Sequence, residues 1–209
     1  MTELSEYGNI PVSAQVLAEG LVGYNSPKDK ISSLEREGNI IRIRNGLYVV
    51  SNRITNQNLS LELIANHLYG PSYISFESAL SYHNLIPERV YVTRSASMGR
   101  GRSYETPLGK FTYTRVPEEY FSIGIQLVNR EGRFSYLIAS PEKALCDLIL
   151  GTRRVRIQSA RAMHNFLLDD MRIDIEFHEN WDLSVIEECI ETGRKRSELE
   201  LLLTVLRHG

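Results

Sequence analysis

The chain has 209 residues, of which 42% are hydrophobic and 24% are charged, and this composition is typical of a globular protein with one large or two small domains. Its 24 Lys and Arg residues against 26 Asp and Glu residues give a formal net charge of −2. This balance excludes a protein that attracts nucleic acid through its overall charge, although a local basic patch remains compatible with DNA binding.

The first predicted elements are helices near residues 12–19 and 27–37. The second helix has a strong start signal, because Ser26 can cap its N-terminus and Pro27 suits its first position. Gly38 is expected just beyond its last turn, where a positive φ ends many helices. The sequence therefore predicts a short helix with well-defined ends.

A β-hairpin is predicted immediately after this helix. The stretch IIRIR alternates in the manner of a strand, which places Ile41 and Ile43 on one face and Arg42 and Arg44 on the other. The Asn-Gly pair that follows predicts a type I′ turn, and the sequence LYVV supplies the returning strand.

The rest of the chain predicts a larger mixed region. Its expected elements are helices near 60–69 and 75–84, strands between about 89 and 138 with a hairpin turn at 129–133, and helices at 141–150, 157–170, 183–192 and 196–207. The polar segment 51–58 favours a boundary between domains at residues 1–54 and 55–209. The predicted fold class is α+β: an N-terminal winged helix-turn-helix, then a mixed α/β domain with a mainly antiparallel sheet and C-terminal helices.

The order of helix, capped helix and hairpin is that of a winged helix-turn-helix, which binds DNA by inserting the second helix into the major groove. The hairpin would reach phosphates or the minor groove beside it. The candidate DNA-binding residues are Lys28, Lys30, Ser32, Ser33, Arg36, Arg42, Arg44 and Asn45. Residues 1–54 hold six acids and six bases, so a module that binds protein or only supports the fold is the alternative.

Charge is unevenly distributed along the larger region. A secondary basic patch is predicted from Arg94, Arg100, Arg102, Arg153, Arg154 and Arg156. Residues 95–110 are expected to form a flexible basic loop that either contacts phosphate or is simply solvated. The arginines between 153 and 161 would either extend a DNA track or neutralise the acidic segment 169–200.

Catalytic signals are weak in this sequence. His83 lies on a predicted helix with apolar neighbours and is expected to be a packed, hydrogen-bonded histidine. Asp147 lies in an apolar helix and is expected to be a buried carboxylate that pairs with an arginine or a helix N-terminus. The chain shows no nucleotide-binding glycine motif of the correct spacing, and we expect a protein that is not an enzyme.

Neither a cofactor nor a metal is predicted. The five histidines form no HxxxH or HExxH pair, and Cys146 and Cys189 form no CxxC motif. Two isolated cysteines fit a reducing compartment. The N-terminus lacks a basic region followed by an apolar run, and no stretch approaches the roughly 18 apolar residues of a membrane span. These features predict a cytoplasmic protein without a membrane partner.

Three blocks of the sequence resemble one known family. The stretch from Leu34 to Val49 is similar to its "L…G…R…rGlY" signature, YISFESALSYH at 73–83 resembles its "YISFeSALsyhgL" helix, and SPEKALCD at 140–147 is similar to its "sPekALlDll" helix. The family is that of the AbiEi-like antitoxins, and the blocks occur in the family's order.

This resemblance implies a bacterial transcriptional repressor of a type IV toxin–antitoxin system. Its winged helix would bind inverted repeats in double-stranded DNA at its own promoter. The C-terminal domain would counter a nucleotidyltransferase-like toxin without forming a stable complex with it. A homodimer on DNA is also expected, because one winged helix buries too little surface for tight specific binding.

Overall fold

The computed structural model describes residues 3–87, 90–130, 132–152, 157–173, 175, 178, 180–192 and 194–208. In this part of the chain the fold is α+β, with a three-stranded sheet, a six-stranded sheet and helices around both. Antiparallel strand pairs predominate, and the six-stranded sheet contains both parallel and antiparallel pairs. None of the described helices is long and apolar enough to cross a membrane.

The first unit ends with the predicted hairpin. Its elements are η1 Leu4–Tyr7, β1 Val12–Ser13, α1 Ala14–Gly20, α2 Pro27–Arg36, β2 Ile40–Arg44 and β3 Leu47–Val50, with strand order β1-β3-β2. The Ser26 hydroxyl accepts a hydrogen bond of 3.4 Å from the backbone N–H of Asp29, as expected of an N-cap. The observed α2 therefore begins where the sequence predicts.

A β-bulge divides the two arginines of the hairpin, so their predicted placement on one face is wrong. Arg42 lies opposite Tyr48, whereas Arg44 lies opposite Leu47, with the register shifting between them. Because residues directly opposite each other share a face, the two arginines point to different sides of the sheet. The turn also differs from type I′: Gly46 has φ +74°, but its partner in the turn does not have the positive φ that type I′ requires.

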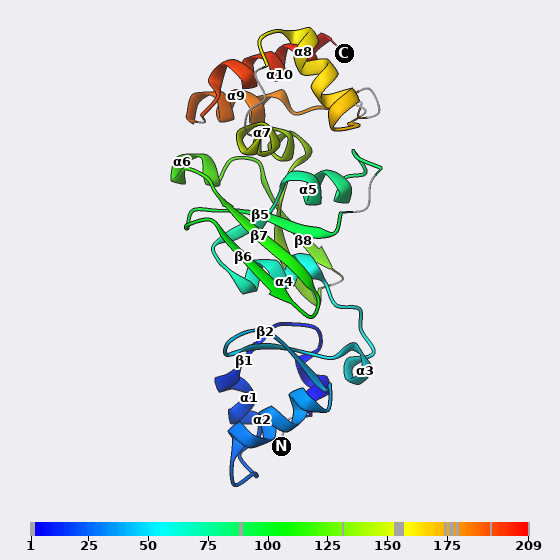
Figure 1. Cartoon of the computed structure of the whole chain (residues 1–209), viewed down its shortest axis with the longest axis vertical. Coiled ribbons are helices and arrows are strands. Elements are labelled where there is room, and N and C mark those ends of the chain that lie inside the picture. The colour runs from blue at the N-terminus through cyan, green and yellow to red at the C-terminus, as the bar shows by residue number, and fades with distance from the viewer. Residues whose placement is uncertain are drawn as a thin grey trace.

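The small sheet is buried on both faces. On one side Ile40, Tyr48 and Val50 pack with the helices of the first unit in a small core of their own. On the other side Ile43 and Val49 join the main core of the chain. Strand β2 lies against β6 of the larger sheet, and Figure 1 shows the hairpin between α2 and the second unit. The hairpin is thus a packed layer, and only its turn and edge are accessible.

The second unit is built on a sheet of order β6-β7-β5-β4-β9-β8. Its elements are α3 Asn52–Thr55, α4 Leu61–Leu68, β4 Ser72–Ile74, α5 Phe76–Tyr82, β5 Val92–Ser97, β6 Arg102–Thr106, β7 Gly109–Arg115, α6 Glu118–Phe121, β8 Ile125–Arg130, β9 Phe134–Ala139, α7 Pro141–Gly151, α8 Ala160–Asn165, the π-helix η2 Phe166–Asp170, α9 Leu183–Thr192 and α10 Arg196–His208. Helix α4 lies on the side of the sheet that faces the first unit. Helices α5 and α7 lie on the opposite side, with α8, α9 and α10 beyond them (Figure 1).

The prediction of a flexible loop at residues 95–110 is wrong. Strand β5 continues to Ser97, and β6 forms an antiparallel hairpin with β7 in which Tyr104 lies opposite Phe111. Strand β6 is an edge strand with mostly exposed side chains, so it lacks the apolar alternation that would have revealed it. The expected helix at 157–170 begins at Ala160 and ends in π-helical turns.

Candidate nucleic-acid interface

The outer surface of α2 carries a stripe of polar and basic side chains. Lys28, Ser32 and Arg36 are spaced four residues apart and are all exposed, so they form one line along the helix. Ser32 and Arg36 face away from buried Ile31 and Leu34, and Lys28 begins the line at the flank of the helix. Figure 1 places α2 at the end of the molecule farthest from the second unit. The stripe is therefore open to a large partner.

The other two predicted residues of α2, Ser33 and Lys30, are less available. The Ser33 hydroxyl donates a hydrogen bond of 2.8 Å to Glu37 on the same helix. Lys30 lies on the flank, where its ammonium group is 5.0 Å from the centre of the Tyr24 ring. Ser32 donates to the backbone oxygen of Lys28 at 3.1 Å, but its oxygen remains exposed and can accept.

Arg42 is engaged within the first unit. Its guanidinium donates to the Glu35 carboxylate on α2 at 2.6 Å and lies 5.6 Å from the centre of the Tyr48 ring. The hydrogen bond to Glu35 is the main cause that raises the pKa of Arg42, with the Tyr48 hydroxyl contributing. Arg42 thus ties the hairpin to α2, and its charge is balanced by that of Glu35.

Arg44 and Asn45 are exposed near the hairpin turn. Arg44 is on the side that faces the larger sheet, close enough to Tyr113 for its charge to oppose the rise in the pKa of that hydroxyl that burial causes. The turn is fixed against the start of α1, because the Gly46 carbonyl accepts from the backbone N–H of Ala14 at 2.9 Å. Of the predicted hairpin residues, these two remain free to contact a partner.

The secondary basic patch is not one surface. Arg94 donates to Glu77 at 2.7 Å and stacks 4.3 Å from the Phe76 ring centre, on the α5 side of the sheet. Arg102 stacks 5.3 Å from the Tyr69 ring centre, on the α4 side, with exposed Arg100 two residues before it. Of these three arginines, the structure thus groups only Arg100 and Arg102. Arg153, Arg154 and Arg156 lie outside the described residues.

A buried polar cluster joins α7 to the start of α5. Asp147 is fully buried and accepts a hydrogen bond of 2.5 Å from the Ser75 hydroxyl. Its ionic partner is Lys143, 3.8 Å away and also fully buried, whereas the sequence predicted an arginine or a helix N-terminus. Burial is the largest cause of both shifts: it raises the pKa of Asp147 and lowers that of Lys143. The prediction of a buried carboxylate is confirmed, with its partner corrected.

Two further predictions concern single residues of this core. His83 is hydrogen-bonded through Nε2 to the Ala139 carbonyl oxygen at 2.9 Å, as expected of a packed histidine, and burial lowers its pKa. Cys146 and Cys189 are buried free thiols that lie against each other, and burial raises the pKa of Cys146. Sequence reasoning missed this contact because the two cysteines are 43 positions apart and belong to different helices.

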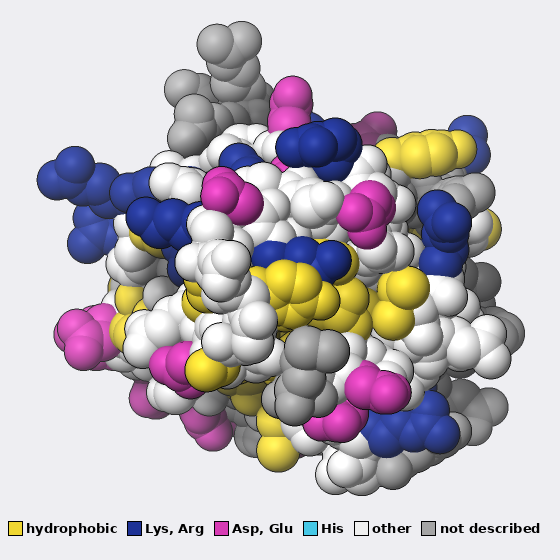
Figure 2. Space-filling view, turned by 90° about the horizontal axis from the view of Figure 1, so that it is seen from below, with side chains coloured by type: hydrophobic (Ala, Val, Ile, Leu, Met, Phe, Trp, Pro, Cys, Tyr) yellow, Lys and Arg dark blue, Asp and Glu magenta, His cyan; other side chains and the backbone are white. Residues whose placement is uncertain are grey.

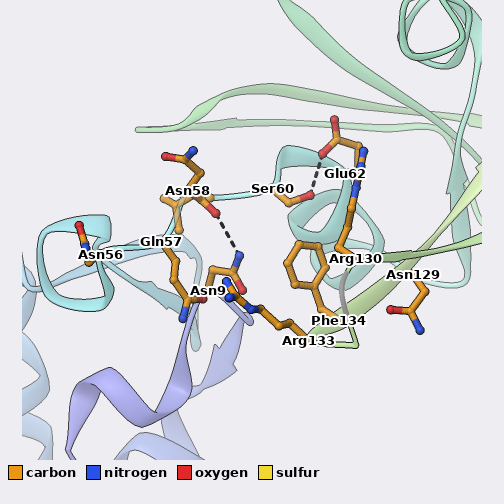
Figure 3. A pocket seen from close by; sticks show the side chains of 11 residues that line it. Asn9, Asn56, Gln57, Asn58, Ser60, Glu62, Asn129, Arg130, Arg133 and Phe134 are labelled. Atoms are coloured by element: carbon orange, nitrogen blue, oxygen red, sulfur yellow. Dashed lines mark hydrogen bonds between the residues drawn. The ribbon is translucent and has the colours of Figure 1, made fainter.

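A polar pocket of about 690 Å³ lies between the segment that links the two units and the β8–β9 hairpin. Figure 3 shows its walls, which are rich in amides: Asn9 donates to the Asn58 carbonyl oxygen at 3.0 Å. The Arg130 guanidinium donates to the hydroxyls of Tyr82 and Tyr136. Across the part of the chain that the structure describes, no group of three or more His, Cys, Asp or Glu side chains could hold a metal. The bond from Asn9 ties the first unit to the linking segment, the bonds of Arg130 lie within the second unit, and these contacts provide no arrangement of acid, base and nucleophile.

Comparisons with known proteins add no family assignment. No protein-family model matches the chain, and a search of curated proteins found no match.

Proposed function

We propose that the chain is a DNA-binding transcriptional regulator whose first unit is a winged helix-turn-helix. The observation that carries this proposal is the exposed stripe of Lys28, Ser32 and Arg36 on a capped helix at the end of the molecule. A ten-residue helix is about 15 Å long, which suits insertion of its first turns into a major groove about 12 Å wide. Short polar and long basic side chains in one line match base edges flanked by phosphates.

The hairpin contributes less than an extended wing would. Arg42 is already paired with Glu35, and most of the remaining hairpin is packed between α2 and the second unit. Arg44 lies on the side that faces the larger sheet, so Asn45 at the turn is the hairpin residue placed to contact a phosphate backbone, and α2 supplies most of the binding. This distribution predicts a small number of phosphate contacts per chain, so a pair of chains on an inverted repeat is needed for high affinity.

The resemblance to AbiEi-like antitoxins supports a more specific version of the proposal. In that version the protein represses its own promoter through inverted repeats and counters a nucleotidyltransferase-like toxin without binding it stably. The first matching block covers the end of α2 and the hairpin, while the second and third meet at the hydrogen bond from Ser75 to Asp147. The protein would act in the cytoplasm and would not be an enzyme.

The test is a binding titration by fluorescence anisotropy on the DNA upstream of the gene, repeated across a salt series. The logarithm of the binding constant should fall linearly with the logarithm of salt concentration, with a slope of about −0.9 per phosphate contact. A scrambled duplex of the same length should bind more weakly at every salt concentration. Binding that does not depend on salt, or no preference for any inverted repeat, would contradict the proposal.

Arg42 provides a prediction that separates this structure from a simple winged-helix pattern. Arg42→Ala should change the dissociation constant for DNA by no more than about threefold, because Arg42 is held by Glu35 and supplies no direct phosphate contact, so that only the general effect of one lost positive charge remains. Arg36→Ala, which removes an exposed arginine from the same unit, is the matched comparison and should weaken binding more. Equal losses in the two variants would show that Arg42 leaves Glu35 to contact DNA.

A second candidate function is a protein-binding module. Val22 has 81% of its surface exposed, and the exposed side chains of Ile10, Val16 and Tyr24 belong to the same part of the chain. Figure 2 shows hydrophobic side chains near the centre of this end of the molecule, with Lys and Arg interspersed among Asp and Glu. A pull-down from lysate in high salt distinguishes the two functions, because apolar docking survives salt and phosphate contact does not.

A further inference from the structure

A second pocket opens beside the last turn of α7, on the side of the sheet opposite the first unit. Its volume is about 520 Å³, within the range of sites for small molecules. The walls come from separate parts of the chain: Phe76, Thr114, Arg115, Val116, Pro117, Asp147, Leu150, Gly151 and Arg194. This pocket is distinct from the α2 surface and independent of the function proposed above.

Two arginines give the pocket a positive charge. Arg115 closes β7 and Arg194 lies between α9 and α10, and both are exposed. Neither side chain has a hydrogen-bond or ion-pair partner among the described residues. The acids nearest in sequence, Glu118, Glu119 and Glu191, are not part of the lining. Two unpaired guanidinium groups at one pocket favour a ligand with a dianionic group.

One wall of the pocket holds an unusual backbone conformation. Phe76 has φ +54°, which is rare for a bulky residue, and its side chain is buried. Arg94 lies 4.3 Å from the ring centre, and a Cβ added to Gly151 would approach the ring to 3.0 Å. The close approach of α7 to this ring keeps the wall rigid, and a preformed wall reduces the entropy lost on binding.

The remaining lining is suited to the rest of an organic ligand. Val116, Pro117 and Leu150 form an apolar surface, which could pack against a planar ring. Asp147 lies behind the inner wall, where its carboxylate is fully buried and its Oδ1 atom faces the Lys143 ammonium group at 3.8 Å.

We propose that this pocket binds a small organic phosphate of the nucleoside monophosphate class. A phosphomonoester carries a charge of about −1.5 to −2 at pH 7, which matches the charges of Arg115 and Arg194 better than a carboxylate does. The base would pack against the apolar surface of Val116, Pro117 and Leu150.

The test uses AMP and UMP as probes, with adenosine and inorganic phosphate as partial ligands. Calorimetry should detect binding of at least one nucleotide, and adenosine and phosphate should each bind at least about tenfold more weakly. The double variant Arg115→Ala/Arg194→Ala should lose at least about tenfold in affinity, since each arginine supplies a charge-assisted hydrogen bond. Arg196→Ala is the control: it removes a nearby arginine that pairs with Glu200 outside the pocket and should leave binding unchanged.

Each contrary outcome is specific to this site. Absence of nucleotide binding at millimolar concentration would overturn the proposal, as would equal binding by wild type and the double variant. Because both arginines are exposed, their replacement should leave the thermal unfolding curve unchanged, so a loss of binding is attributable to the pocket. A protein that binds its promoter but no nucleotide overturns only this proposal, and the reverse result overturns only the first.

Discussion

Replacing Asp147 with alanine should lower the free energy of unfolding by about 3–5 kcal/mol, the loss typical of removing one partner from a buried ion pair. The change leaves the ammonium group of Lys143 fully buried with no counter-charge and removes the acceptor of the Ser75 hydroxyl. Urea unfolding followed by circular dichroism measures the effect, provided that the slope with denaturant stays constant. The loss should exceed that of any exposed salt bridge in the chain.

The Lys143–Asp147 ion pair is not expected to stabilise the fold more than two apolar side chains of similar size would. Burial disfavours the ionised form of both groups, as the raised pKa of Asp147 and the lowered pKa of Lys143 indicate. The double variant Lys143→Met/Asp147→Leu should therefore be close to wild type or more stable. Glu187→Ala, which removes the exposed partner of Arg207, is a control that should cost less than about 1 kcal/mol. A loss below 1 kcal/mol for Asp147→Ala would mean that the pair is solvated.

Local signals in the sequence placed the helices well. The start of α2 follows from Ser26 and Pro27, whose effects act within one turn and do not depend on the rest of the fold. Strands β4 and β6 were missed for opposite reasons. The three residues of β4 are all buried and too few to show a period, and β6 lies at a sheet edge where exposed polar side chains hide the alternation.

Features of the candidate sites that depend on distant contacts were harder to predict. The bulge that separates Arg42 from Arg44 is seen in the pairing of β2 with β3, and the regular alternation of IIRIR gives no sign of it. The partner of Asp147 was readable, because Lys143 lies four residues earlier on the same helix and thus on the same face. The contact between Cys146 and Cys189 could not be read from the sequence, because it depends on how α9 packs against α7.

The packing of the hairpin also determines which residues should matter for DNA. A sheet that is buried on both faces cannot move toward a duplex without exposing Ile43 and Val49 of the main core. The duplex must therefore approach α2 from the end of the molecule, where the first unit is exposed. This geometry assigns most of the binding to the outer stripe of α2 and less to the hairpin than the sequence alone suggested.

The double variant Lys28→Ala/Arg36→Ala should weaken binding to an inverted-repeat duplex by roughly 100-fold at moderate salt. Each contact with a base or phosphate contributes about 1–3 kcal/mol, and tenfold in affinity corresponds to about 1.4 kcal/mol. If both side chains contact phosphates, the slope of binding against salt should also become shallower by about 2. Stability should be unchanged, since both side chains are exposed and neither forms a hydrogen bond or an ion pair through its side chain among the described residues.

The matched control for this variant is Arg196→Ala/Arg207→Ala, which removes two positive charges from α10 in the second unit. Its net charge equals that of the α2 variant, so any general electrostatic effect should be the same in both, whereas only the α2 variant removes groups from the proposed interface. Binding by the control should therefore remain near the wild-type value. If the two variants lose affinity equally, α2 does not form the interface. The exposed arginines Arg100 and Arg102, which lie just before and at the start of β6, then become the residues to replace next.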